Sequence, residues 1–60
     1  MPFIEVNMYE GRTPDQKKKL IEGLTKAFID IGTPAEAVQI ILKECPRTNW
    51  ATGGKFASER

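Results

Sequence analysis

The stretch TPDQKKKLIEGLTKAFIDIG, residues 13–32, decides the fold because it carries the strongest helix signal of the chain. Thr13 supplies an N-cap hydroxyl, Pro14 suits the first helical position, and Gln16 stands at the capping-box position. The glycine that closes the stretch suits a helix end, so the pattern predicts a helix from Pro14 to about Ile31. Its apolar residues recur at helical spacing and form one face: Leu20, Ile21, Leu24, Ala27, Phe28 and Ile31.

Strand patterns flank this helix on both sides. In residues 2–9, Ile4, Val6 and Met8 alternate onto one face. Residues 38–44 contain three consecutive apolar side chains, which indicates a strand buried on both faces. A strand, a helix and a strand at this spacing form a β-α-β unit, whose two strands are expected to be parallel.

Two shorter features complete the chain. Residues 33–36 repeat the capping pattern and predict a single helical turn. In the tail, residues 49–56, two glycines stand between short extended pieces and predict a β-hairpin. The expected fold class is therefore α+β. One domain, residues 1–60, contains a small β-α-β unit with a parallel two-stranded sheet and a C-terminal β-hairpin.

The size of the chain predicts association. A domain of 60 residues is marginal alone, and this one has a single cysteine and no histidine for a disulfide or a zinc site. A two-stranded sheet has open edges that accept further strands. The face away from the helix still carries Phe3, Tyr9 and Ile41. We therefore expect the sheet to be extended by oligomerisation.

Composition excludes several classes of function. The chain has 9 Lys+Arg and 8 Asp+Glu, and this net charge of +1 argues against dedicated nucleic-acid or membrane-surface binding. Without histidine there is no His–Cys metal site and no histidine-activated nucleophile. No apolar run approaches a membrane span of ~18 residues. No secretory signal pattern opens the chain, so a cytoplasmic location is expected.

Several polar or reactive residues have simpler structural interpretations. The lysines at 17–19 fit a solvated helix face, because no aromatic platform accompanies them. Gly53-Gly54 fits a hairpin turn, since no phosphate-loop pattern surrounds it. Cys45 has no histidine to activate its thiol. Nothing aligns the helix carboxylates as a catalytic pair: Asp15, Glu22 and Asp30.

Pro2 and Arg12 together suggest a reaction class. Removal of Met1 is expected because proline is small, and it would make Pro2 an amino-terminal secondary amine. An apolar pocket beside cations lowers the pKa of such an amine, which then serves as a base. Arg12 follows the first strand and can hold a carboxylate by two hydrogen bonds. The simpler interpretations are an edge-strand proline and a surface arginine. Together the two residues fit proton abstraction next to a carbonyl of a carboxylic acid.

These motifs resemble the 4-oxalocrotonate tautomerase family. The resemblance lies in Met1-Pro2 before a short strand, in Glu10-Gly11-Arg12-Thr13, in Gln16-Lys17, and in the tail NWATGGK at residues 49–55. It covers essentially the whole chain. It implies a homohexamer, a trimer of dimers, and a cofactor-free keto–enol tautomerase of aromatic-compound degradation. The expected substrates are unsaturated 2-hydroxy or 2-oxo acids such as 2-hydroxymuconate.

The resemblance also assigns roles to single residues. Pro2 is the expected general base, Arg12 binds the substrate carboxylate, and Trp50 helps to form an apolar pocket that keeps the pKa of the proline low. Family members carry a second arginine in strand two, where this chain has Gln39, which can donate a hydrogen bond to substrate but supplies no charge. Arg47 or Lys43 are alternative cations.

The glutamine leaves three other interpretations open. A hetero-oligomer is one, with the missing arginine supplied by a partner chain. A hydratase or dehalogenase acting on an unsaturated acid is another, in which a protonated Pro2 is the acid. A non-catalytic oligomeric subunit is the third.

Overall fold

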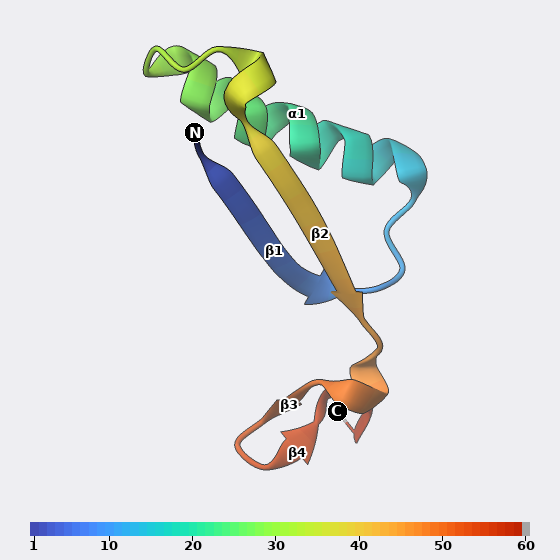
Figure 1. The fold of residues 1–60 in the computed structure, drawn as a ribbon. Coiled ribbons are helices and arrows are strands. Elements are labelled where there is room, and N and C mark those ends of the chain that lie inside the picture. The colour runs from blue at the N-terminus through green and yellow to red at the C-terminus, as the bar shows by residue number, and fades with distance from the viewer. Residues whose placement is uncertain (60) are drawn as a thin grey trace.

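Two parallel strands and one connecting helix form the body of the molecule. Strand β1 (Phe3–Tyr9) pairs with strand β2 (Gln39–Cys45), and helix α1 (Pro14–Asp30) joins them. The computed structural model describes residues 1–59 and is drawn in Figure 1. The register runs from Phe3 opposite Gln39 to Tyr9 opposite Cys45. The predicted parallel β-α-β unit is confirmed, with strand limits within one residue of those expected.

Helix α1 begins and ends at the residues predicted from the sequence, within one residue. Thr13 Oγ1 accepts a hydrogen bond from the Gln16 N–H at 3.2 Å, and Gln16 Oε1 accepts one from the Thr13 N–H at 3.0 Å. This reciprocal pair is the predicted capping box. At the other end Ile31 is the C-cap, and Gly32 has a φ of 100° that suits glycine.

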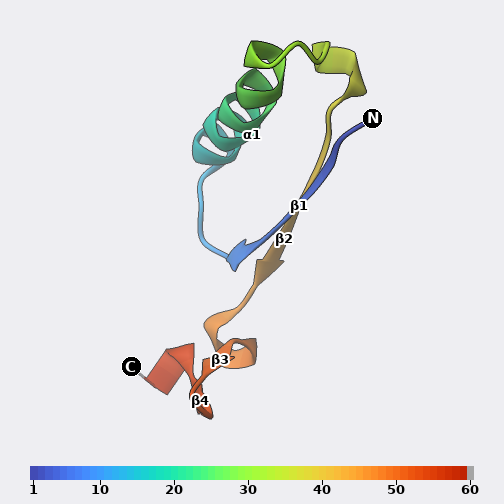
Figure 2. The ribbon, with the colours of Figure 1, turned by 90° about the vertical axis from the view of Figure 1, so that its left-hand side faces the viewer.

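Helix α1 covers only one face of the sheet, as the edge view in Figure 2 shows. Half-buried side chains alternate along the strands, with Ile4, Val6 and Met8 in β1 and Ile40 and Leu42 in β2. The buried part of the helix is narrower than the predicted apolar face, because two strands are too few to cover that face. Leu20, Leu24 and Phe28 are half-buried, whereas Ala27, Ile21 and Ile31 are exposed.

The opposite face of the sheet is uncovered within one chain. Phe3 is 56% exposed and Ile41 is 44% exposed. The expected burial of β2 on both faces is therefore not achieved by this chain alone. Tyr9 departs from the expectation in the other direction, since it is half-buried against Trp50 in the tail.

The tail forms the predicted hairpin beyond the ends of β1 and β2 (Figure 1). Strand β3 (Ala51–Thr52) pairs antiparallel with strand β4 (Lys55–Phe56) around a turn in which Gly53 and Gly54 have φ values of 61° and 80°. The predicted single turn before β2 is a 3₁₀ turn, Ala35–Ala37, but its cap is Pro34 without a side-chain hydrogen bond.

The chain is extended for its size. Its radius of gyration is 14.4 Å, against about 10 Å for a compact domain of this length. Its accessible surface is 4680 Å², against roughly 3900 Å² for a folded monomer of this mass. Ala57, at 6% exposure, is the only buried residue of the described part of the chain. None of the helices described in residues 1–59 could cross a membrane.

Candidate active site

Pro2 and Gln39 lie together at the amino-terminal end of the sheet. The Gln39 N–H donates to the Pro2 carbonyl at 3.1 Å, and Gln39 Nε2 donates to Met1 Sδ at 3.3 Å. Pro2 is half-buried, while Met1 is 89% exposed. While Met1 is attached, the Pro2 nitrogen is an amide without basic character. Removal of Met1 would free this nitrogen and the donor group of Gln39 at the same place.

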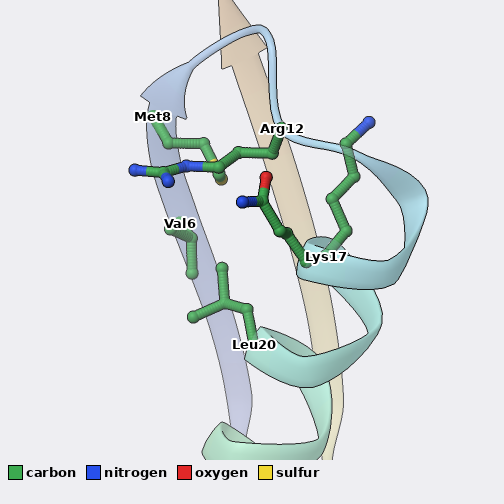
Figure 3. Close-up of a pocket in the computed structure, with 6 residues that line it drawn as sticks. Val6, Met8, Arg12, Lys17 and Leu20 are labelled. Carbon is green, nitrogen blue, oxygen red and sulfur yellow. The ribbon is translucent and has the colours of Figure 1, made fainter.

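Arg12 lies at the other end of β1, over a pocket between the strand and the start of α1. The pocket has a volume of about 320 Å³ and an apolar floor formed by Val6, Met8 and Leu20. Figure 3 shows the Arg12 side chain extending across it towards Met8. Lys17 also lines the pocket, but its ammonium is ion-paired with Glu44.

Gln16, the remaining polar residue of the pocket, is neutral, which leaves Arg12 as its available charge. The Gln16 side-chain oxygen accepts the Thr13 N–H in the capping box. Arg12 is exposed and has no ion pair or hydrogen bond with any other residue in the described part of the chain. A guanidinium above an apolar floor is suited to receive the carboxylate of a small unsaturated acid.

Trp50 lies beyond the end of the sheet in an aromatic cluster. Its ring meets the Tyr9 ring edge-on, with centroids 4.7 Å apart and an interplanar angle of 60°. The Arg47 guanidinium carbon lies 4.2 Å from the centroid of the Tyr9 ring. The Ala57 N–H donates to the Trp50 carbonyl at 2.7 Å and attaches the hairpin to this cluster.

The structure separates the four predicted site residues into two groups. Pro2 and Gln39 are at the start of the parallel strands, whereas Arg12 and Trp50 follow their ends. The seven residues of β1 lie between the groups, a span of about 20 Å. Figures 1 and 2 both show the N-terminus at the end of the sheet opposite the hairpin. One chain therefore does not bring the expected base and the expected carboxylate-binding arginine together.

The contact between Arg47 and Tyr9 was not predicted from the sequence, in which Arg47 was one of two alternative cations. The signal lies in the strand register, because Tyr9 ends β1 opposite Cys45, which ends β2, and Arg47 follows two residues later. Among residues 1–59, no three His, Cys, Asp or Glu side chains are grouped to hold a metal ion.

Comparison with known proteins gives a consistent result. A family model described as Tautomerase enzyme matches residues 2–60. A 2-hydroxymuconate tautomerase of Pseudomonas putida is 40% identical over 60 residues, which is 98% of this chain and 95% of the relative. TomN, a 4-oxalocrotonate tautomerase homologue of the tomaymycin biosynthetic pathway, is 43% identical with a TM-score of 0.94, covering 98% of this chain and 92% of that one. A heterohexamer 4-oxalocrotonate tautomerase from Chloroflexus aurantiacus is 33% identical with a TM-score of 0.90, covering 98% and 97%.

Proposed function

Because this chain belongs to the tautomerase family and is an isomerase, we propose that its substrate is an unsaturated 2-hydroxy or 2-oxo carboxylic acid. The observation that carries the proposal is the Arg12 guanidinium over an apolar pocket, since this pairing suits a carboxylate joined to a conjugated chain. The first compound to test is 2-hydroxymuconate, because the Pseudomonas putida relative is named a 2-hydroxymuconate tautomerase.

In the proposed mechanism, Pro2 moves the proton. The amine of Pro2, free after removal of Met1, takes the proton of the 2-hydroxyl group and leaves a dienolate. The resulting ammonium returns the proton to a conjugated carbon, so that the enol becomes a ketone and no co-reactant is needed. The exposure of Met1 supports its removal, because a peptidase can reach it.

The other predicted residues bind and stabilise in this mechanism. Arg12 holds a carboxylate of the substrate by a bidentate contact. Gln39 donates a hydrogen bond to the dienolate, and the amide that now bonds Met1 Sδ is the group available for this. Trp50 excludes water from the site, which strengthens each of these interactions.

We propose that each site is completed by two chains. Pro2 and Arg12 lie at opposite ends of β1, so a substrate of six carbons does not reach both in one chain. A second chain, placed with its Pro2 end at the Arg12 end of the first, brings the two groups together. Members of the family are small oligomers. A homohexamer, a trimer of dimers, is the proposed assembly, and a heterohexamer like that of the Chloroflexus aurantiacus relative is the alternative.

The test begins with the intact mass of the protein from its own cell. A mass lower by one methionine is the expected result, since the mechanism needs a free Pro2 amine. Pro2→Ala should then lose most turnover of 2-hydroxymuconate, while its circular dichroism and sedimentation stay like those of the wild type. The control is Lys18→Ala, which changes an exposed residue of α1. Unchanged turnover in Pro2→Ala would remove Pro2 from the mechanism.

A retained Met1 would favour a second function, that of a non-catalytic subunit. The observation in favour of this function is Gln39, which supplies no charge where the family carries an arginine. In that case this chain should show no turnover alone.

A further inference from the structure

We propose that Arg47 is the second cation of the active site and binds the 2-oxygen and neighbouring carboxylate of the substrate. This inference rests on the proposed function and adds to it the residue that meets the developing negative charge. Dienolate formation places this charge on the 2-oxygen, and Gln39 offers it only a neutral donor. A positive group elsewhere in the assembled site is therefore needed to balance the charge.

The ion pairs of the chain reduce the number of candidates. Lys17 is paired with Glu44, Lys26 with Asp30 and Lys43 with Glu5. The last pair also disfavours Lys43, the other cation considered from the sequence. Among residues 1–59, the cations without a carboxylate partner are Arg12, Lys18, Lys19, Arg47 and Lys55.

Position selects Arg47 from this group. Lys18 and Lys19 lie on α1, and Lys55 lies in β4. Arg47 instead follows the end of β2 by two residues, as Arg12 follows the end of β1 by three. The strands are parallel, and the Glu10 N–H donates to the Cys45 carbonyl at 3.1 Å where they end. Both arginines therefore leave the same end of the sheet. Arg47 lies against the Tyr9 ring of the Trp50 cluster, and Arg12 lies over the pocket at the start of α1.

The contacts of Arg47 keep its charge available. Its guanidinium carbon lies 4.2 Å from the Tyr9 ring centroid, so the described contact is with an aromatic face and not with an anion. A guanidinium over a ring keeps N–H donors at its edge for a carboxylate or an enolate oxygen. Tyr9 is itself held by Trp50, and Pro46 precedes the turn. These contacts already restrict the Arg47 side chain, so Arg47 loses less conformational entropy when it binds substrate.

The two arginines are assigned to different ends of the substrate. Arg12, above its apolar pocket, takes the distal carboxylate of a dicarboxylic acid. Arg47 takes the end that carries the 2-oxygen. A dicarboxylate and a monocarboxylate share this second end, so a change at Arg47 affects both substrates alike.

The test compares Arg47→Ala and Arg47→Gln with Lys55→Ala, a matched loss of one exposed cation in the same tail. The substrates are 2-hydroxymuconate and 2-hydroxypenta-2,4-dienoate, which lacks the distal carboxylate. Both Arg47 variants should lose about 10²-fold in kcat on each substrate, while Lys55→Ala stays within about twofold of the wild type. Arg47→Lys should recover part of the loss, because it restores the charge without the planar donors. Sedimentation of each variant checks that assembly is retained.

A second measurement tests the part of Tyr9. Tyr9→Phe should keep kcat because the ring face remains, whereas Tyr9→Leu should reduce it on both substrates. Arg47 variants with wild-type kcat, alongside an inactive Pro2→Ala, would overturn the assignment of Arg47 and leave the proposed function intact. A wild-type protein without turnover of either acid would overturn the proposed function, and the assignment of Arg47 with it.

Discussion

At the scale of the residue, Arg12 is distinguished by what its neighbours already do. Lys17 is neutralised by Glu44 and Gln16 carries no charge, so Arg12 is the available cation of the pocket. The type of residue and its place after β1 could be predicted from the sequence. Its availability could not, because it depends on the pairing of Lys17 with Glu44 in a strand far along the chain.

Removal of the Arg12 guanidinium should therefore affect binding of the distal carboxylate. Arg12→Ala is expected to raise KM for 2-hydroxymuconate by about 10-fold or more, as one charged hydrogen-bonded contact is lost. KM for the monocarboxylate should rise much less. Steady-state kinetics on both acids, with the exposed helix variant Lys18→Ala as control, checks this. Equal increases on the two substrates would show that Arg12 does not bind that carboxylate.

At the scale of the element, local signals in the sequence were sufficient to predict the start of the helix and the hairpin. The helix start could be predicted because Thr13 and Gln16 contact each other within one turn. The hairpin could be predicted because Gly53 and Gly54 allow positive φ. What covers each face could not be predicted in this way. Ile41 is an apolar residue of the kind usually buried but is 44% exposed, because α1 covers only the other face of the sheet.

The turn glycines give a prediction at the same scale. An added Cβ at Gly53 meets no atom within 4 Å, so the cost of substitution comes from its φ of 61° alone. Gly53→Val should lower the free energy of unfolding by about 1–2 kcal/mol, whereas Gly53→Asn should cost less because asparagine tolerates this conformation. Urea unfolding followed by fluorescence of Trp50, the single tryptophan, measures both. Equal losses in the two variants would contradict a backbone origin.

At the scale of the whole molecule, one chain does not complete its own core. Its surface exceeds that of a compact monomer of the same mass, and one side of its sheet is open. The proposed joint action of Pro2 and Arg12 would also require a second chain, because they lie at opposite ends of β1. Their separation could have been predicted from the sequence, because the extended residues between them fix a minimum distance. The contact of Tyr9 with Arg47 could not, since it requires the register of β1 and β2.

A charge on the open face should prevent assembly. Ile41→Glu is expected to shift sedimentation at micromolar concentration towards a 6.7 kDa monomer and to lower thermal stability, because a buried unpaired carboxylate is costly. Ala35→Glu adds the same charge at an exposed turn and should sediment like the wild type. An Ile41→Glu protein that sediments like the wild type would show that this face is not an interface.

The placement of Pro2 and Arg12 at opposite ends of β1 has a genetic consequence. If every site draws its base from one chain and its carboxylate-binding group from another, a chain that has lost both groups disables two sites. In a mixed population the fraction of intact sites then falls as the square of the fraction of sound chains. A defective allele expressed beside a normal one would therefore be partly dominant. Two alleles, each lacking a different group, would complement each other in part.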